Sequence, residues 1–276
     1  MCSNSVMDRS DPEALRAVAT RLAGEAAEVA AGLRARAITQ VRTKSTDTDV
    51  VTAADTETER LLRGRLAELR PGDAVLGEEA GMDGAASPAE GQLCWVIDPI
   101  DGTVNYLYGY PWYAVSVAVT RDGAALAGAV VEPASGRVWS AAAGGGASLD
   151  GEPLRASGAE RLDLALIGTG FSYHRGRRVR QGELATGLLS RVRDIRRGGA
   201  ASLDLCAVAA GWLDGYYEHG INPWDWAAGA LVASEAGAAV HAPDPAAPFG
   251  DAIVVAAPGI DAQLTDALSE LGAGGV

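Results

Sequence analysis

Apolar side chains recur at helical spacing in two segments near the start of the chain. In the first segment, Leu15, Val18 and Leu22 lie three or four positions apart, and the pattern continues to about residue 37, which predicts a long amphipathic helix. Ser10 followed by Glu13 three positions later is typical of a capping box. We therefore expect this helix to begin at Ser10.

A second helix is predicted from Thr52, where Asp55 repeats the capping pattern. The Pro71-Gly72 pair is expected to end it. The buried stripe of this helix is formed by Leu61, Leu62, Leu66 and Leu69.

From residue 74 onward, short apolar runs replace the helical spacing, and turn pairs such as Asp122-Gly123 separate them. This pattern predicts a largely antiparallel sheet with helices on one side. Gly144-Gly145-Gly146 fits a hairpin turn better than a phosphate-binding loop, because nothing downstream completes such a motif. The predicted strands comprise residues 74–77, 94–98, 113–120, 126–133 and 137–143.

After residue 150 the predicted strands and helices alternate, which indicates a smaller α/β unit. We expect two halves. Residues 1–150 form an α+β half with the antiparallel sheet, and residues 151–276 form the α/β half. The glycine-rich residues 272–276 are expected to be frayed. In the second half, the predicted strands comprise 164–168, 194–196 and 252–257, and the predicted helices comprise 177–192, 202–212 and one that opens at 222–226.

The composition is that of a soluble globular protein, with 48% hydrophobic and 21% charged residues and no apolar run long enough to span a bilayer. The start of the chain shows no secretory signal, so we expect a cytoplasmic location. Cys2, Cys94 and Cys206 are far apart in sequence and are expected to be reduced. The formal charge of −13 argues against nucleic acid and anionic membranes as partners, but not against divalent cations.

Two aspartates follow directly on an apolar strand, at Asp98 and Asp101. Pro99 fixes the backbone between them, and Gly102 permits a sharp turn. Thr103 is expected to cap a short helix over residues 104–108. A metal ion on the two aspartates would let a phosphate group rest on the backbone amides of Gly102 and Thr103.

Two further acidic segments are candidates for the same site. Glu78 follows another short apolar strand, and Asp225 opens a helix in the second half. Taken singly, the segment 98–103 also fits a surface turn, Glu78 a solvated sheet edge and Asp225 a helix cap. Carboxylates from several segments are what a two-metal magnesium site for phosphate chemistry requires, so we expect all of them to converge.

A covalent mechanism has little support in the sequence. No serine or cysteine lies near an evident base, and the three histidines, His174, His219 and His241, occur in unrelated contexts. His219 could contact substrate, but it fits an ordinary surface or interface histidine better. Metal-activated water therefore remains the preferred nucleophile.

The acidic motifs resemble those of the inositol monophosphatase family. The resemblance is carried by residues 98–103, by Gly77-Glu78-Glu79 and by residues 224–229, and it extends to residues 49–55 and 197–205. It implies a layered αβαβα sandwich, α+β or α/β in class, of the inositol monophosphatase and fructose-1,6-bisphosphatase type. It also implies a homodimer, two or three Mg²⁺ ions and inhibition by Li⁺.

The resemblance also implies roles for individual residues. Glu78 and Asp98 would hold the first metal ion with the carbonyl of Ile100, and Asp98, Asp101 and Asp225 the second, while a third ion lies near Glu78. Asp55 and Thr103 would orient and deprotonate the attacking water, with Glu78 also counted as catalytic and Lys44 in the loop that closes over the site. The implied substrate contacts are Asp101, Gly102, Thr103, Gly199, Ala200, Ala201, Glu218 and Asp225.

The predicted function is Mg²⁺-dependent hydrolysis of a small phosphorylated polyol, with inositol 1-phosphate as the first candidate. Ala200 stands where many members of the family carry serine or threonine, which leaves the polyol open. Histidinol phosphate, fructose 1,6-bisphosphate or another small ester is the alternative substrate. A non-catalytic binding partner is the second alternative, for which the basic segment 175–180 is the one notable feature, better explained as a solvated or dimer-interface face.

Overall fold

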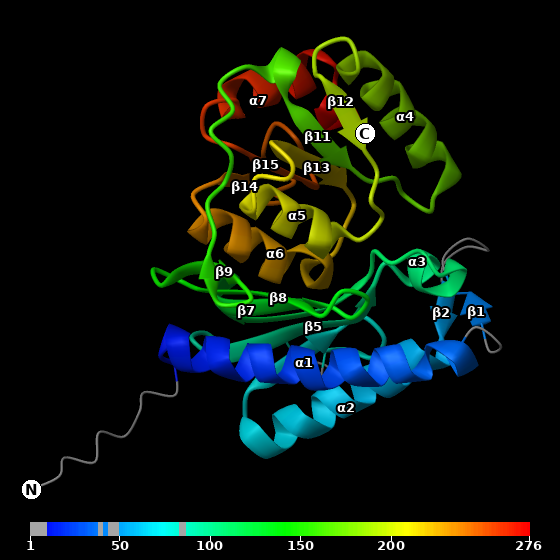
Figure 1. Cartoon of the computed structure of the whole chain (residues 1–276), viewed down its shortest axis with the longest axis vertical. Coiled ribbons are helices and arrows are strands. Elements are labelled where there is room, and N and C mark those ends of the chain that lie inside the picture. Colours follow the sequence, from blue (N-terminus) through cyan, green and yellow to red (C-terminus); the bar gives the residue numbers. More distant parts are fainter. Residues whose placement is uncertain (1–9, 38–40, 44–49, 83–86) are drawn as a thin grey trace, which may run out of the picture.

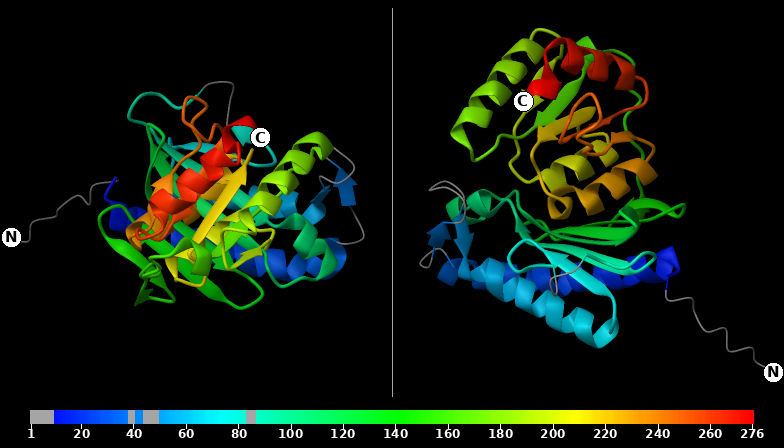
Figure 2. Two further views of the ribbon diagram at one scale, coloured as in Figure 1. Left: turned by 90° about the horizontal axis from the view of Figure 1, so that it is seen from above. Right: turned by 180° about the vertical axis from the view of Figure 1, so that it is seen from behind.

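The chain is arranged as five alternating layers of helices and sheets (Figure 1). The computed structural model describes residues 10–37, 41–43, 50–82 and 87–276. Helices α1 (Pro12–Ala37) and α2 (Ala53–Leu69) form the first layer, α5 (Ala201–Ala209) and α6 (Pro223–Glu235) the third, and α4 (Arg175–Leu188) and α7 (Asp261–Glu270) the fifth. Figure 2 shows the same layers from behind. The predicted αβαβα sandwich is confirmed.

The first sheet has eight strands in the order β10-β9-β8-β7-β6-β5-β3-β4. Its described pairings are antiparallel except that between β3 and β5, which is parallel, so the predicted sheet type is confirmed. The strands are β3 (Ala74–Gly77), β4 (Gly81–Met82), β5 (Leu93–Asp101), β6 (Ala114–Arg121), β7 (Ala124–Glu132), β8 (Arg137–Ala142), β9 (Gly146–Leu149) and β10 (Glu152–Pro153).

The second sheet has five strands in the order β12-β11-β13-β15-β14. Its strands are β11 (Leu166–Thr169), β12 (Asp194–Arg196), β13 (Gly215–His219), β14 (Ala239–His241) and β15 (Ala252–Ala256). The predictions lacked β13, β14 and helix α7. A separate hairpin joins β1 (Val41–Thr43) to β2 (Val50–Thr52), and short helical turns lie at η1 (Leu162–Leu164) and η2 (Ala273–Gly275). The division into halves near residue 150 stays a prediction.

Helices cover both faces of the first sheet, which corrects the expectation of helices on one side. Side chains of β6 alternate between the two faces, as strand geometry requires. Val117 and Val119 pack with α1 and α2, whereas Ala118 packs with residues of α5 and α6. The third layer therefore fills the space between the sheets and brings the amino ends of α5 and α6 toward the end of β5.

The helix starts follow capping chemistry. The predicted capping box of α2 is confirmed, since Thr52 and Asp55 exchange hydrogen bonds. For α1 the prediction is off by one residue, because Asp11, not Ser10, accepts the Ala14 amide at 3.1 Å. The short helix α3 (Thr103–Tyr108) has Gly102 as its amino-terminal cap, and no described side chain caps it. The predicted capping role of Thr103 is therefore wrong.

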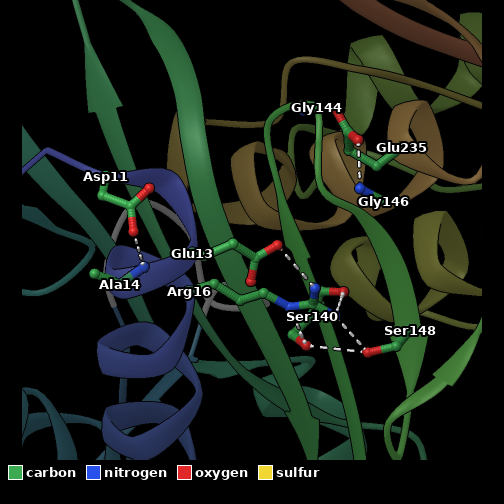
Figure 3. A network of polar contacts seen from close by, with 9 residues as sticks. All are labelled: Asp11, Glu13, Ala14, Arg16, Ser140, Gly144, Gly146, Ser148 and Glu235. Atoms are coloured by element: carbon green, nitrogen blue, oxygen red, sulfur yellow. Dashed lines mark hydrogen bonds and ion pairs between the residues drawn. The ribbon is translucent and has the colours of Figure 1, made fainter.

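The glycine turn at residues 144–146 joins β8 to β9 as a hairpin, as predicted. Its amides are used within the protein, because Gly144 and Gly146 donate to the Glu235 carboxylate at 2.8 and 2.9 Å (Figure 3). Beside this turn, Arg16 of α1 donates to the Ser148 hydroxyl at 2.5 Å. These bonds tie the first and third layers, both of them helical, to the sheet between them.

Several smaller expectations have clear outcomes. Cys94 and Cys206 are buried, whereas Cys2 lies outside the described residues. The expectation of a frayed end is wrong, because Ala273 is buried and its carbonyl contacts His219. Among the described helices, none is long and apolar enough to cross a bilayer.

Candidate active site

A cavity of about 400 Å³ opens where β5 ends against the amino ends of α5 and α6. Most predicted site residues line it. They are Glu78, Asp98, Ile100, Asp101, Gly102, Thr103, Gly199, Ala201, Glu218 and Asp225.

Three carboxylates from two distant segments converge at this cavity. Asp98, Asp101 and Asp225 each offer an oxygen within 4.8 Å of the others, and the two β5 aspartates are buried. Glu78 lies beside them because β3 pairs with β5 in parallel, with Gly77 opposite Ile97. Four acidic groups therefore share one small volume.

Hydrogen bonds fix the orientation of each aspartate. Asp98 accepts the Ile100 amide at 2.9 Å. Asp101 accepts the Ser202 amide at 2.7 Å and the Ala201 amide at 3.2 Å, at the start of α5. Asp225 caps its own helix through the Asn222 amide. Each carboxylate is thus held from outside the cluster, with oxygen lone pairs left to bind a cation.

The clustered charges shift the pKa values of these acids upward. Burial raises the pKa of Asp98 well above its usual range, and Glu78, Asp101 and Asp225 raise it further. Burial also raises the pKa of Asp225, with Asp101 and Glu78 adding to the shift. For Asp101, burial raises the pKa to about 6, although hydrogen bonds from Ser202 oppose that rise. A bound divalent cation would offset this repulsion.

A hydrogen-bonded pair links α2 to the cavity. The Thr103 hydroxyl lies 3.1 Å from Asp55 Oδ1 and 3.0 Å from the Ile100 carbonyl. Asp55 is fully buried, and its Oδ2 accepts the amide and hydroxyl of Thr52 at 2.8 and 2.6 Å. Oδ1 is therefore the oxygen that faces Thr103, which lines the cavity.

The opposite wall carries the predicted polyol contacts. Burial raises the pKa of Glu218 to about 7, against the opposing effects of the Tyr216 hydroxyl and the Arg197 guanidinium. Gly170 packs so closely on the Glu218 carboxylate that a Cβ there would overlap it. This close packing fixes where the carboxylate lies.

Two described site residues, Asp55 and Ala200, are not in the cavity lining, although Asp55 bonds to Thr103, which is. Ala200 is fully buried and is not part of the described lining of the cavity. It packs against Gly102, where a Cβ would lie 3.1 Å from the Ala200 Cβ. Its methyl group packs behind Gly102, and the expected substrate contact of Ala200 stays a prediction. Lys44 lies outside the described residues.

The sequence interpretation missed part of the cavity wall. Arg197 is the one lysine or arginine in the described lining, and the loop 171–174 and Trp224 also line it. Arg197 begins one of the recognised segments, yet nothing in its local sequence shows where its side chain lies. His219 lines the cavity too, but it is buried and its Nε2 lies 3.0 Å from the Ala273 carbonyl. It is thus not a surface histidine.

Comparison with known proteins identifies the family. The model of the inositol monophosphatase family matches residues 11–273. The chain belongs to this family. An inositol-1-monophosphatase from Mycobacterium leprae is 54% identical over an alignment 280 residues long, which covers 94% of each chain. The chain is accordingly a phosphoric monoester hydrolase.

Other relatives of this inositol monophosphatase family member bear different names. A protein of Pseudomonas aeruginosa named Nus factor SuhB is 40% identical over 197 residues, covering 70% of this chain and 72% of that protein. Among solved structures, Mycobacterium tuberculosis SuhB superimposes with a TM-score of 0.83 at 47% identity, covering 97% of this chain and all of that one.

Proposed function

We propose that the protein hydrolyses a small polyol phosphate monoester, with inositol 1-phosphate as the first candidate, using bound Mg²⁺ and a water nucleophile without a covalent intermediate. The convergence of Asp98, Asp101 and Asp225 within 4.8 Å carries this proposal. The name of the Mycobacterium leprae relative supports the substrate.

The donor set fits magnesium. All donors are oxygens, as Mg²⁺ prefers, and the acids raise one another's pKa where no cation offsets them. We assign Glu78, Asp98 and the Ile100 carbonyl to one ion, with a third, weaker ion near Glu78. The Ile100 carbonyl already accepts from Thr103, but a carbonyl oxygen has a second lone pair. The second ion would be held by Asp98, Asp101 and Asp225.

Bound Mg²⁺ would neutralise phosphoryl charge and lower the pKa of a water molecule. The protein's own contribution is a proton path. The Thr103 hydroxyl accepts a proton from the water while its own proton moves to Asp55 Oδ1, 3.1 Å away. The proton would thus move along an existing hydrogen bond, while Oδ2 keeps its two bonds from Thr52.

Substrate orientation is assigned to two walls of the cavity. The amides of Gly102 and Thr103 are proposed to bind the phosphate, whereas Glu218 and Gly199 face the polyol hydroxyls. Ala201 lines the cavity, but its amide donates to Asp101 and its carbonyl lies within helix α5, so its methyl group is what remains for a substrate.

The substrate assignment is tested by measuring phosphate release from a panel of small phosphate esters with Mg²⁺. We expect inositol 1-phosphate to be hydrolysed far faster than fructose 1,6-bisphosphate, histidinol phosphate or adenosine 3′,5′-bisphosphate. Equal or reversed rates would remove inositol 1-phosphate and leave the alternative esters.

A non-catalytic role in a complex is the second candidate, favoured by the relative named Nus factor SuhB. Two features argue against direct RNA contact. The formal charge is −13, and part of the basic segment 175–180 is engaged internally, with Arg177 paired to Asp251 and Arg178 bonded to the Ser172 carbonyl. A gel-shift assay with RNA at physiological salt tests this role, and a shifted band would support it.

Three further parts of the proposal rest on the family. We propose a homodimer, a cytoplasmic location and inhibition by Li⁺. Light scattering of the purified protein tests the first, cell fractionation the second, and phosphate release with added lithium chloride the third.

A further inference from the structure

Helix α2 carries a buried carboxylate one turn beyond Asp55. Glu59 is only 2% exposed, and it is not part of the described lining of the cavity. Residues four apart lie on one face of a helix, so Asp55, Glu59 and Arg63 form a row along α2. A buried acid requires partners, and Glu59 finds them in Arg63 of the same helix and in the turn between β3 and β4.

Three hydrogen bonds hold the Glu59 carboxylate. Oε2 accepts the Glu79 amide at 2.7 Å, and Oε1 accepts the Ala80 amide at 3.0 Å. Arg63 donates to Oε1 at 2.8 Å and also to the Gly81 carbonyl at 2.6 Å. Bonds of this kind to a charged acceptor are about twice as strong as neutral ones, so the turn is firmly attached to α2.

These bonds complete a backbone clamp around Glu78. On its amino-terminal side, the Glu78 amide donates to the Ile97 carbonyl at 3.3 Å, next to Asp98. On its carboxyl-terminal side, the next two amides are held by Glu59. Gly77 makes the approach possible, because a Cβ there would lie 2.6–2.7 Å from the Glu59 carboxylate.

The clamp opposes an electrostatic force. Glu78 lines the same cavity as Asp98, Asp101 and Asp225, so like charges would push an unrestrained turn away from the cluster before a cation arrives. A turn fixed at both ends keeps that movement small. Less reorganisation is then required when an ion binds.

We propose that Glu59 is a positioning residue that sets the divalent-cation affinity of the site by fixing the backbone on the carboxyl-terminal side of Glu78. This inference rests on the proposed function, in which Glu78 holds a metal ion. Helix α2 thereby places both the proton acceptor Asp55 and the ligand Glu78 from one rigid element.

The test is calorimetric titration of substrate-free protein with Mn²⁺, comparing wild type, Glu59→Gln and Glu57→Gln. Glu59→Gln keeps the shape but loses the charge and one acceptor, and we expect affinity to fall by about 10-fold or more. Glu57→Gln is the matched control, because Glu57 lies on the same helix, is exposed and pairs only with the helix residue Arg60 in the described contacts. Its affinity should equal that of wild type.

Steady-state kinetics give the second readout, because a change in the Mg²⁺ requirement can be distinguished from a change in kcat. The Mg²⁺ concentration for half-maximal activity should rise in Glu59→Gln, while kcat at saturating Mg²⁺ stays close to wild type. A lower Tm with unchanged Mn²⁺ affinity would show a merely structural role and overturn the inference. If wild type itself binds no Mn²⁺, the proposed function fails instead.

Glu59→Asp covers the case in which Glu59→Gln does not fold. The shorter side chain retains the charge beside Arg63 but withdraws from the Glu79 and Ala80 amides. We expect weaker Mn²⁺ binding here as well. Wild-type affinity in Glu59→Asp would contradict the inference.

Discussion

Replacement of Asp98 by asparagine should stabilise the metal-free protein while abolishing turnover. Asp98 is 1% exposed and lies within 4.8 Å of both Asp101 and Asp225 through their oxygens. At that separation an effective dielectric of about 20 gives about 3 kcal/mol of repulsion for each ionised pair. Asparagine removes this repulsion and retains an oxygen for the Ile100 amide.

The expected gain is smaller than the sum of the pairs, because the raised pKa of Asp98 keeps the cluster partly protonated. We expect about 2 kcal/mol at about pH 8, which corresponds to a rise in Tm of about 5 °C for a chain of this size. Turnover should be lost, because one neutral oxygen can neither bridge two cations nor balance their charge.

Thermal unfolding with and without Mg²⁺, followed by a phosphate-release assay, measures both effects. Mg²⁺ should raise the Tm of wild type but hardly that of Asp98→Asn. Asp204→Asn is the matched control, since Asp204 is buried and its pKa is raised by burial, yet it is not one of the clustered ligands. It should keep its Mg²⁺ response. Retained turnover in Asp98→Asn would show that Asp98 is not an essential metal ligand. A metal-free variant less stable than wild type would show that Asp98 is not under net repulsion from its neighbours.

Three further predictions follow from the same geometry. Thr103→Val removes the hydroxyl that lies 3.1 Å from Asp55, so kcat should fall by about 10²-fold or more, while the Mn²⁺ affinity measured by calorimetry stays the same. An unchanged kcat would exclude the proton path. Gly170→Ala should displace the Glu218 carboxylate and raise KM more than it lowers kcat. An unchanged KM would show that Glu218 does not contact the substrate. The free energy of unfolding of the metal-free protein should fall as pH rises from about 4 to about 7. Asp101 alone accounts for about 3 kcal/mol of this fall, because its pKa is about 6 in the folded state and 3.8 ordinarily. The folded protein therefore keeps the proton to a higher pH than the unfolded chain does. Denaturant titration checks this, and a stability that rises over that range would contradict it.

The sequence predicted well the elements whose signals are local. The capping box at Thr52 and Asp55 places the start of α2, because both partners lie within four residues. The second helical layer was missed on the first sheet although β5 is buried at all nine positions. A continuous apolar run without polar alternation is typical of a strand covered on both faces, and that signal is visible in the segment 93–97.

Short elements in the second half were harder to predict. Strand β13 has five residues, begins with Gly215 and is followed by Gly220, so its run offers little periodicity. Helix α7 was missed despite a usable signal, since Ile260, Leu264 and Leu268 recur at helical spacing and are buried. This spacing alone would have predicted the helix.

The acidic residues of the site could be predicted from the sequence, whereas the residues that pack around them could not. The segment 98–103 indicates a phosphate site through its own chemistry, whereas the approach of Asp225 depends on how α6 packs against the first sheet. The local sequence around Arg197 and Glu59 does not show where either side chain lies. Their roles depend on contacts between residues far apart in sequence, such as Glu59 with the Glu79 amide.

Anomalous diffraction from crystals soaked in Mn²⁺ would show whether the clustered carboxylates bind divalent cations. We expect at least one strong anomalous peak in the cavity, bound by oxygens of Asp98, Asp101 and Asp225, and a second peak between Asp98 and Glu78. Crystals that bind Mn²⁺ elsewhere, or not at all, while the three carboxylates keep their positions would contradict this expectation.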